Sequence, residues 1–453
     1  MQYSIVNYSE VIENTDFRLS AEYYHPICLE IHRKIKNNGG ISFFKCITKF
    51  SAGKNLPQVK NGNFKFIRTQ NIKPILVNDN GMSYTNILDE LTEIGELLFV
   101  RVGAGVGNSS IVTPNSVNST VSDNILRIKI RGLNPFFLCC FFNSTVGQTY
   151  FSRVFKGTAR GLISRENFRD IFIPQFSHGF QSLIEKLCLE ADSLHEQSGF
   201  KYHEAQTLLL AELGLADWQP KQQLTFVKNF SDTERTGRID AEYFQPKYDD
   251  IVDAIKNYSG SWDTLENLAR VKDTNFNPDA EIEYQYIELA NIGNSGEITD
   301  CMVEHGEDLP TRARRKVAAG DVIVSSIEGS LESIALITEE YDNALCSTGF
   351  HVVQSDVLNS KVLLVLLKSI VGQLQLKKGC NGTILTAINK AEFSRIAIPK
   401  ITEDKQAEVE QKVIEFFNLH NRAKDLLEHA KHAVEIAIEQ DEETAINWLE
   451  SVT

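Results

Sequence analysis

The sequence lacks the features that mark membrane, secreted and metal-binding proteins. Its longest apolar runs, residues 136–142 and 362–367, are far shorter than the ~20 residues that cross a bilayer. No charged segment followed by an apolar one opens the chain, as a secretory signal would require. The eight cysteines contain no Cys-x-x-Cys pair and no matching histidine spacing, so neither a zinc site nor a disulfide framework is indicated. We therefore expect a soluble, cytoplasmic protein with free thiols, in which the adjacent Cys139 and Cys140 pack in the core.

Motifs for catalysis are missing as well. Gly103-Ala-Gly-Val-Gly107 lacks the lysine of a phosphate loop and the glycine spacing of a dinucleotide-binding turn. Residues 133–136 match the Asn-Pro-Pro-aromatic motif of amino-methyltransferases only in part, and residues 278–283 lack the lysine of a nuclease metal site. The ten histidines have no triad partner at a recognisable spacing. We predict a non-enzymatic chain with no catalytic residues, no metal site and no cofactor of its own.

The charge of the chain is unevenly distributed. A net charge of −14 argues against binding to nucleic acid, because neutralising phosphates needs a basic surface. However, residues 401–453 contain 13 acidic and 5 basic residues, so this segment alone holds −8. Basic residues dominate elsewhere, with five against one acid in 153–169, four against one in 377–395, and four among the five residues 312–316. Acid is thus concentrated near the C-terminus and base in predicted loops.

The same pattern occurs twice in the sequence. The two halves match at an offset of 220 residues, which becomes 225 from Gly95 onward. The matching pairs include Arg18 and Arg238, Tyr23 and Tyr243, Phe66 and Tyr286, Asn71 and Asn291, Gly95 and Gly320, Ser144 and Ser369, Gly147 and Gly372, Gly157 and Gly382, Phe168 and Phe393, and Ile173 and Ile398. This period is far too long for a solenoid, whose units span roughly 20 to 50 residues. Two related units can present similar surfaces about a pseudo-twofold axis, which suits a long target such as a DNA duplex.

Each half is predicted to be a mixed α/β block followed by a long helix. In the first half we expect strands at 63–72, 96–102, 125–130 and 170–174, and helices at 135–148 and around Phe168. The pattern then changes to a 3.6-residue period for about 35 to 40 residues, and we expect the two long helices to pair as an antiparallel coil. The predicted division is a first block at 1–178, a first helix at 179–215, a connector at 216–236, a second block at 237–402, and a second helix with the C-terminal tail at 403–453.

Two recurring loops, residues 156–164 and 380–389, combine glycine, hydroxyl or amide groups, and flanking cations. Such groups can donate hydrogen bonds to phosphate oxygens and base edges. A Gly-Thr turn before a capped helix would explain the glycine and Ser164 or Asn389, but not the cations. The two interpretations carry equal weight and are compatible.

The order of the repeated motifs resembles the specificity subunit of Type I restriction-modification enzymes. The motifs are Phe/Tyr-Ile-x-x-x-Asn-Ile, Gly-Asp/Glu before apolar residues, Ser-x-x-Gly-Gln, Gly-Thr and Ile-x-Ile-Pro, each set being followed by a long helix, and they extend over residues 18–448. The resemblance implies two globular target recognition domains that read a bipartite DNA sequence, separated by coiled-coil-like spacer helices. It also implies a subunit without its own catalysis. Its partners would be two modification subunits, which methylate adenine with S-adenosylmethionine, and motor-nuclease restriction subunits, which use ATP and Mg.

We predict that polar and basic residues of the repeated loops and strand ends contact double-stranded DNA. In the first half these are Lys65, Arg68, Gln70, Asn71, Arg101, Asn108, Arg153, Lys156, Thr158, Arg160, Ser164 and Arg165. In the second half they are Asn291, Arg312, Arg314, Arg315, Lys316, Ser326, Lys377, Lys378, Asn381, Thr383, Thr386 and Asn389. Two alternatives remain, namely the same architecture in another defence or methylation complex, and a scaffold that binds proteins or glycans.

Overall fold

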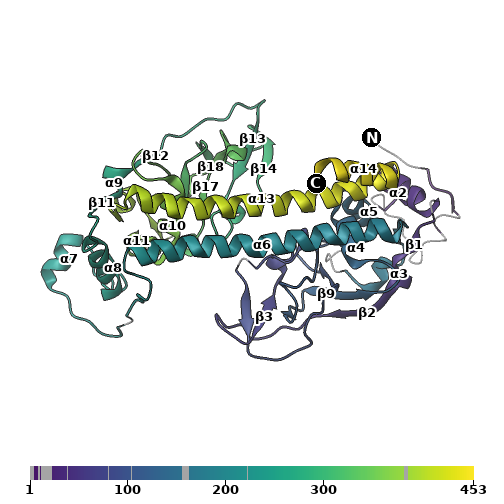
Figure 1. The fold of residues 1–453 in the computed structure, drawn as a ribbon, viewed down its shortest axis with the longest axis horizontal. Helices are drawn as coiled ribbons and strands as arrows, with labels where there is room; N and C mark the ends of the chain where they lie inside the picture. Colours follow the sequence, from purple (N-terminus) through teal and green to yellow (C-terminus); the bar gives the residue numbers. More distant parts are fainter. Residues whose placement is uncertain are drawn as a thin grey trace. The chain divides into compact units, whose positions relative to one another are not determined.

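A computed structural model of the chain divides into two compact units. Unit 1 comprises Met1–Gln197 and Leu419–Thr453, and unit 2 comprises Ser198–Asn418. Both units are mixed α/β, as the sequence predicted, and each contains one β-rich block and parts of two long helices, α6 (His178–Glu212) and α13 (Glu403–Glu439) (Figure 1). The structure describes residues 5–8, 11, 23–37, 39–79, 81–103, 105–155, 163–221, 223–381 and 386–453.

The block of unit 1 is built on a five-stranded sheet in the order β2-β9-β6-β7-β4 and a three-stranded sheet in the order β5-β3-β8. Its strands are β1 (Ile41–Ser42), β2 (Ile47–Ala52), β3 (Phe64–Ile67), β4 (Ile75–Leu76), β5 (Ser83–Thr85), β6 (Leu97–Val100), β7 (Ser109–Ile111), β8 (Thr120–Val121), β9 (Ile125–Ile130) and β10 (Phe172–Ile173). Its helices and 3-10 turns are α2 (Pro26–Asn37), α3 (Phe43–Cys46), η1 (Thr69–Asn71), α4 (Pro135–Asn143), α5 (Thr145–Phe155) and η2 (Arg165–Phe168). The predicted strand at 125–130 is confirmed, and the other three predicted strands contain the shorter β3, β6 and β10.

The block of unit 2 repeats this plan with sheets in the orders β12-β19-β16-β17 and β14-β13-β18-β15. Its strands are β11 (Trp262–Thr264), β12 (Arg270–Lys272), β13 (Glu283–Ile287), β14 (Met302–His305), β15 (Ala313–Lys316), β16 (Val322–Ser325), β17 (Ile334–Leu336), β18 (Leu345–Ser347), β19 (Phe350–Gln354), β20 (Cys380–Asn381), β21 (Ala387–Ile388) and β22 (Ala397–Pro399). Its shorter helices and 3-10 turns are α7 (Phe230–Thr236), α8 (Pro246–Lys256), α9 (Leu265–Leu268), η3 (Leu289–Asn291), η4 (Glu328–Ser330), η5 (Glu339–Tyr341), α10 (Ser360–Lys368), α11 (Ile370–Gly379) and α12 (Lys390–Ser394). Among the strands described in unit 1, none corresponds to β15, which carries the basic run at 312–316.

The core of unit 1 contains an unusually aromatic helix. All residues of the apolar run 136–142 on α4 are buried, including Cys139 and Cys140, so the predicted core role of these cysteines is confirmed. The helix begins at Asn134, whose side-chain oxygen accepts hydrogen bonds from the N–H groups of Phe136 and Phe137. Proline at the first helical position fits this start, because its missing N–H is one that the helix does not use.

The predicted single helix at 135–148 is wrong, because the chain turns a corner at Ser144 and continues as α5. Ser144 is extended (φ −70°, ψ 158°), and its hydroxyl donates to the carbonyl of Phe141 (2.7 Å). In unit 2, Ser369 donates to Leu366 in the same way (2.7 Å). The Ser-x-x-Gly-Gln motif therefore encodes a helix corner.

The glycine and glutamine of this motif complete the corner. A Cβ atom at Gly147 would overlap the carbonyl of Phe141, and one at Gly372 would overlap the backbone of Leu367. The amide of Gln148 donates to Phe142 O (2.6 Å), and that of Gln373 donates to Leu367 O (3.0 Å). Both halves thus need glycine here because two helix backbones approach closely.

Each long helix is attached to its block by the same glutamine. Gln181 accepts the N–H of Asn134 (2.9 Å) and donates to Phe176 O (2.9 Å). At the 225-residue offset, Gln406 accepts the N–H of Asn359 (2.9 Å) and donates to Ile401 O (2.9 Å). One amide therefore joins the start of α4 or α10 to the first turn of a long helix.

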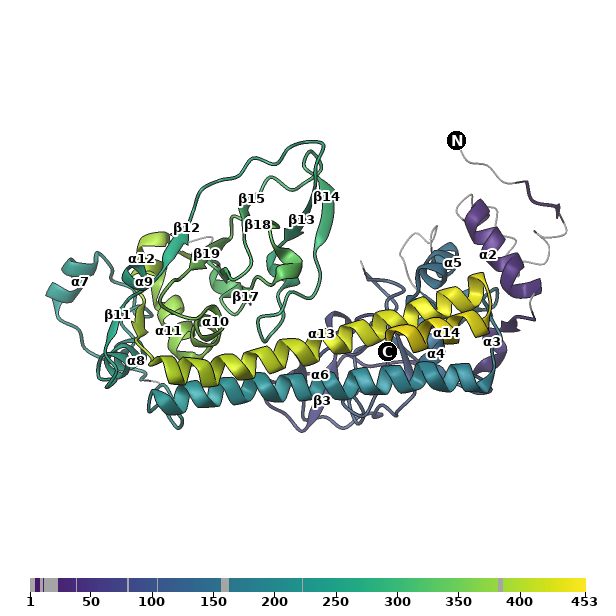
Figure 2. The same ribbon diagram turned by 45° about the horizontal axis from the view of Figure 1, so that its top comes forward.

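The two long helices pack together, as the sequence predicted. Within unit 2 the ring centroids of Tyr202 and Phe416 are 5.5 Å apart, and Lys201 pairs with Glu415 (3.1 Å). Within unit 1, Glu190 pairs with Arg422 (3.1 Å). Lys412 also pairs with Glu204 (3.0 Å), so the residue numbers rise along α6 as they fall along α13 and the two helices run antiparallel; Figures 1 and 2 show them side by side. No helix among the described residues is long and apolar enough to cross a membrane.

The second predicted helical segment, 403–453, comprises two helices. The helix α13 ends near Gln440, and Asp441 caps the N-terminus of α14 (Glu442–Val452) by accepting the N–H of Thr444 (2.8 Å). An aspartate in this position favours a new helix start over a continued helix. The connector predicted at 216–236 also contains structure, since it ends in α7.

Each block buries one acidic side chain against a cation, but the cation comes from different strands. Glu96 (1% exposed) pairs with Arg127 of β9 (2.8 Å) in unit 1. The matching acid in unit 2 is Asp321 (1% exposed), which pairs with Lys272 of β12 (2.7 Å). Arg127 lies opposite Ser51 in the β2–β9 pair, whereas Lys272 lies opposite Val352, the residue that matches Arg127. The cation that pairs with the buried acid therefore lies on β9 in unit 1 but on the neighbouring strand, β12, in unit 2.

We expect Gly372→Ala to destabilise the protein by about 1 to 3 kcal/mol, because the added Cβ forces two helix backbones apart. Gly199→Ala is the matched control, since Gly199 lies within α6 with no atom near the place of its Cβ. Alanine there should stabilise the helix by about 0.5 to 1 kcal/mol. Urea unfolding of both variants measures the two changes, and equal effects would contradict the close-approach role of Gly372.

Candidate nucleic-acid interface

The predicted first-half loop ends in an exposed cluster of cations around a phenylalanine. Ser164 and Asn167 form a capping box at η2, and the Arg165 guanidinium lies 4.9 Å from the centre of the Phe44 ring. The Arg169 guanidinium lies at the same distance from this ring. The N–H of Ile163 donates to Arg101 O (3.1 Å), which ties the loop to the end of β6. Because Arg169 also pairs with Glu166, the cluster offers mainly the Arg165 guanidinium and an aromatic edge, groups that bind phosphates and stack on bases.

A second group of predicted residues lies where β3 ends. The side chains of Arg68 and Gln70 both donate to Gly81 O (2.7 and 3.2 Å), and Lys65 donates to Asn115 O (3.0 Å). These bonds hold the cations at the surface of the three-stranded sheet. Gln70 is exposed, and Arg68 and Lys65 are partly exposed.

The repeated asparagine of the Phe/Tyr-Ile-x-x-x-Asn-Ile motif acts inside the fold. Asn71 is fully buried; its side chain accepts the N–H of Arg68 (3.0 Å) and donates to Asn78 O (2.9 Å). Asn291 accepts the N–H of Glu288 in the same way (2.8 Å). We therefore assign both asparagines to turn formation and leave them out of the proposed DNA contacts.

Arg153 and Lys378 also match each other at the 225-residue offset. The Arg153 guanidinium lies 4.1 Å from the centre of the Tyr23 ring, and Lys378 Nζ lies 5.4 Å from that of Tyr243. Arg153 is only 3% exposed. Both cations thus hold the tyrosine of the repeated Ala-Glu-Tyr motif against the last turn of α5 or α11, which is a structural role.

The second half presents its basic run on the edge strand β15. Arg314 donates to Asn277 Oδ1 (3.2 Å), and Lys316 Nζ lies 5.3 Å from the centre of the Phe276 ring. Arg312 and Lys316 are exposed. This strand repeats the chemistry of the first-half cluster, cations beside an aromatic ring, on a different element.

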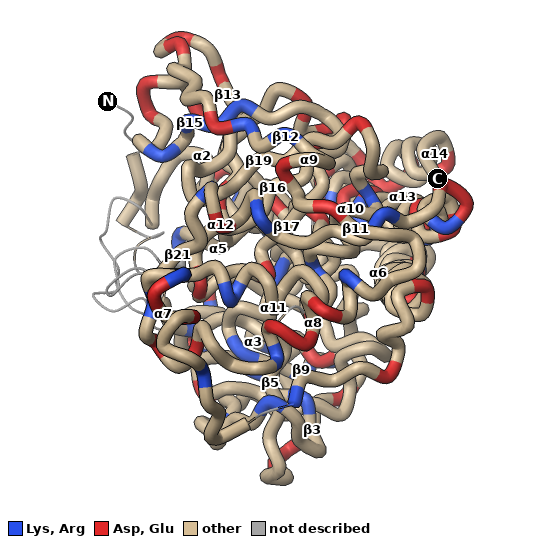
Figure 3. The backbone as a smooth tube through the Cα atoms, turned by 90° about the vertical axis from the view of Figure 1, so that its left-hand side faces the viewer, with Lys and Arg blue, Asp and Glu red and all other residues tan. Residues whose placement is uncertain are grey.

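Three further second-half cations are paired with acids. Lys377 pairs with Glu328, Lys378 pairs with Asp249 (2.8 Å), and Lys390 pairs with Asp273 (2.6 Å). Figure 3 shows blue and red segments interspersed along the tube, in keeping with these pairs. Such pairs reduce the positive charge that Lys377 and Lys378 can offer to DNA.

The other predicted residues divide into exposed and internally bonded ones. Asn108, Asn381 and Asn389 are exposed; Asn389 caps α12 by accepting the N–H of Glu392 (3.0 Å). Ser326 donates to Gly349 O (2.8 Å), and the carbonyl of Thr386 accepts the N–H of Glu328 (2.9 Å). The residues Lys156, Thr158, Arg160 and Thr383 lie outside the described residues.

Four of the predicted arginines carry buried guanidinium nitrogens with no hydrogen-bond partner in the protein. These atoms are Nε of Arg68, Arg101, Arg153 and Arg315, together with Nη1 of Arg153 and Arg315. An unsatisfied buried donor costs about 1 to 3 kcal/mol.

Sequence reasoning missed Phe44, Arg169 and Phe276, which complete the two clusters. None of them lies in a motif shared by the two halves, so the repeat gives no signal for them. Lys390 was also missed, although it matches Arg165 at the 225-residue offset and could have been found from the repeat.

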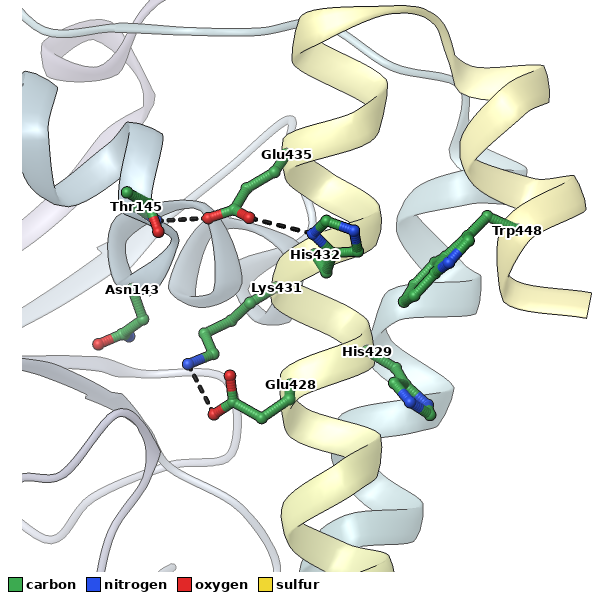
Figure 4. A pocket seen from close by; sticks show the side chains of 8 residues that line it. All are labelled: Asn143, Thr145, Glu428, His429, Lys431, His432, Glu435 and Trp448. Carbon is green, nitrogen blue, oxygen red and sulfur yellow. Dashed lines mark hydrogen bonds and ion pairs between the residues drawn. The ribbon is translucent and has the colours of Figure 1, made fainter. Parts of the chain in front are cut away.

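A pocket of about 340 Å³ lies within unit 1 beside α13 and α14 (Figure 4). Glu435 accepts the N–H of Thr145 (2.5 Å) and lies 3.3 Å from His432 Nδ1. The Trp448 ring is nearly perpendicular to those of His429 and His432, with centroids 5.5 and 4.7 Å away. These contacts hold α14 against α13, and no predicted DNA contact lines the pocket. Within the described ranges, no three His, Cys, Asp or Glu side chains are grouped to hold a metal ion.

Three solved structures match this chain over most of its length. The S subunit of a Type-I restriction-modification system from M. genitalium is 12% identical, with a TM-score of 0.39, over 88% of this chain and 94% of that one. A chain from a study of complex assembly and conformational transition in the type I R-M system is 12% identical, with a TM-score of 0.29, over 87% and 97%. The HsdS subunit from Thermoanaerobacter tengcongensis is 12% identical, with a TM-score of 0.28, over 89% and 96%.

No family model and no curated protein matches the sequence.

We predict that His351 is neutral at pH 7. Burial lowers its pKa below the ordinary value of about 6.5, and the cations Arg315 and Lys390 lower it further, although the bond to Ile388 O opposes this. Because the folded pKa lies below the unfolded one, the stability due to neutral His351 is complete above about pH 6.5 and lost as the pH falls through the folded pKa. At the 225-residue offset, the residue of unit 1 that matches His351 is Leu126. The variant His351→Leu should therefore lose less stability than the wild-type protein between pH 7 and pH 5. Urea unfolding at both pH values checks this, and identical pH dependence in the two proteins would contradict it.

Proposed function

We propose that the chain is a sequence-specific DNA-binding subunit that reads a bipartite target. The observation that carries this proposal is the pairing of a duplicated scaffold with unlike exposed clusters. The helix corner and the glutamine attachment are the same in both units, whereas the cations beside the aromatic rings lie at η2 and α3 in one unit and on β15 in the other. A shared scaffold with different contact residues suits a target of two unlike half-sites.

The exposed clusters fit the chemistry of DNA despite the overall negative charge. Arg165 and Arg169 flank Phe44, and Lys316 lies beside Phe276. Guanidinium and ammonium groups bind phosphates, while exposed amides such as Asn108 and Asn381 can read base edges. The acidic residues are concentrated at 401–453, so repulsion of DNA is strongest near α13 and α14.

The proposed division of labour follows the predicted segments. Residues 1–178 and 237–402 read the half-sites, 179–215 and 403–453 form the spacer helices, and 216–236 connects the halves. The chain positions two DNA adenine-methyltransferase subunits and motor-nuclease subunits of a Type I restriction-modification complex. S-adenosylmethionine, ATP and Mg belong to those partners, and the chain itself supplies recognition without catalysis.

We expect Arg165→Ala and Arg312→Ala each to weaken DNA binding. Loss of a phosphate contact should lower the slope of log affinity against log salt by about 1, and loss of a base contact should cost about 1 to 3 kcal/mol and relax one position of the target. Electrophoretic shift titrations at several salt concentrations, with the complex assembled on its methylated motif, measure both quantities.

The control for this experiment is Arg235→Ala. Arg235 is an exposed cation on α7 that already pairs with Asp232 (2.9 Å). The substitution Arg235→Ala should leave the affinity for DNA and its salt dependence unchanged. If all three variants behave alike, the clusters at Phe44 and β15 are not the DNA-contacting surface.

We also expect the purified chain alone to transfer no methyl group to DNA and to cut none. Addition of the modification subunits should restore methylation of adenine at one bipartite motif. Incorporation of labelled methyl groups, followed by mapping of the modified bases, provides the measurement. Methyl transfer by the isolated chain would overturn the assignment, and salt-insensitive binding to proteins in place of DNA would favour a scaffold.

A further inference from the structure

The sheet β14-β13-β18-β15 of unit 2 has one covered edge and one open edge. At β15, the N–H of Phe276 donates to Arg314 O (2.7 Å), so the preceding segment closes that edge. At β14, all four residues are exposed. The N–H of Gly306 donates to Ile282 O (2.9 Å). Since residues of antiparallel strands face alternately inward and outward, the N–H and C=O of Val303 and the N–H of His305 face the open side.

The matching strand in unit 1 is closed by its own chain. There β5 pairs with β3, and its outer side bridges to Val59 through two bonds, Val59 N–H to Tyr84 O (2.8 Å) and Tyr84 N–H to Val59 O (3.2 Å). At the 220-residue offset, Val59 matches Asp279. In unit 2 the segment around this position bonds just beyond the end of β14, where the N–H of Glu307 donates to Ala280 O (3.4 Å), and in the described residues it forms no bridge to Val303. The open edge is therefore specific to the second block.

The open edge combines apolar side chains with acidic surroundings. Ile282, Met302 and Val303 are 51, 42 and 55% exposed. Residues 279–308 contain nine acidic residues and no lysine or arginine. The acids within or directly after the strand, Glu304, Glu307 and Asp308, are all exposed. An extended segment that pairs here would meet both unpaired backbone groups and negative charge.

We propose that β14 is a docking edge for an extended, basic segment of a partner protein, which adds a strand to this sheet. Strand addition supplies main-chain hydrogen bonds through Val303 and His305, and alternate side chains of the incoming segment contact Met302 or Val303. Lysine or arginine between its apolar residues pairs with Glu304 and the acids that follow. This function differs from DNA recognition, because the acidic edge at β14 attracts a basic polypeptide, whereas the cations of β15 attract phosphate.

Charge excludes the other occupants of an open edge. A second copy of the chain would place Glu304 and Glu307 against the same acids, and like charges across paired strands destabilise the pair. Acidic side chains on edges protect proteins from self-pairing in this way. DNA would meet the same repulsion. A basic strand is the occupant whose backbone forms hydrogen bonds with β14 and whose side chains form ion pairs with its acids.

The test uses the full chain, without DNA, and three synthetic ten-residue peptides. The first alternates valine and lysine, the second replaces each lysine by glutamate, and the third carries N-methyl groups on the backbone nitrogens of one edge. We expect the valine–lysine peptide to bind and the other two to bind at least tenfold more weakly. Fluorescence anisotropy gives the affinities, and hydrogen exchange should show protection at Val303 and His305.

Protein variants assign the binding to β14. Val303→Pro removes an outward N–H, and Glu304→Lys reverses a charge at the edge. Each should lower the affinity for the valine–lysine peptide at least tenfold. Glu304→Lys should also raise the affinity for the glutamate peptide. Glu443→Lys, an exposed acid on α14, is the matched control and should change neither affinity. The N-methyl peptide keeps the test valid if Val303→Pro fails to fold.

Three outcomes would overturn the proposal. They are equal binding of the N-methyl and unmodified peptides, equal effects of Glu304→Lys and Glu443→Lys, and displacement of the peptide by DNA. Concentration-dependent dimerisation that Val303→Pro abolishes would instead assign the edge to a second copy of the chain. None of these results depends on whether the clusters at Phe44 and β15 bind DNA, so the two proposals fail separately.

Discussion

Each unit depends on one glutamine side chain, which accepts one hydrogen bond and donates another. Gln181 and Gln406 each accept an N–H from the start of a buried helix and donate to the last residues before their own helix. A shorter or apolar side chain would leave two partly buried backbone groups unsatisfied, at up to about 1 kcal/mol each. The direction in which each long helix leaves its block follows from this attachment, and so does the face that it turns toward the other long helix.

On this common frame the two units differ mainly at their surfaces. The segment between Ile292 and Gly320 is five residues longer than its counterpart, and it contains β15 and the open strand β14. One edge of the same small sheet is therefore basic and covered, while the other is acidic and open. The two edges of this one sheet thus carry opposite charge.

The repeat predicted the fold well but gave no signal for the exposed clusters of cations and aromatic rings, for one physical reason. A residue that recurs in both halves is one that both folds need, such as Asn71 with Asn291 in turns and Gly147 with Gly372 in the helix corner. These positions revealed the strands, the long helices and their pairing. The exposed clusters of cations and aromatic rings differ between the halves, so Phe44, Arg169 and Phe276 left no trace in the repeat. The broken helix at Ser144 was missed because apolar periodicity continues through the corner, and only the serine hydroxyl and the glycine reveal the turn.

The exchanged cation has a consequence for how such chains can be recombined. A hybrid that joins β2 to β19 would bury an acid with neither Arg127 nor Lys272 beside it, whereas one that joins β12 to β9 would crowd both cations around one acid. Either mismatch leaves a buried charge uncompensated, at a cost of several kcal/mol. A crossover within α6 moves each acid together with its own cation. Whole blocks are thus interchangeable modules, whereas pieces of blocks are not.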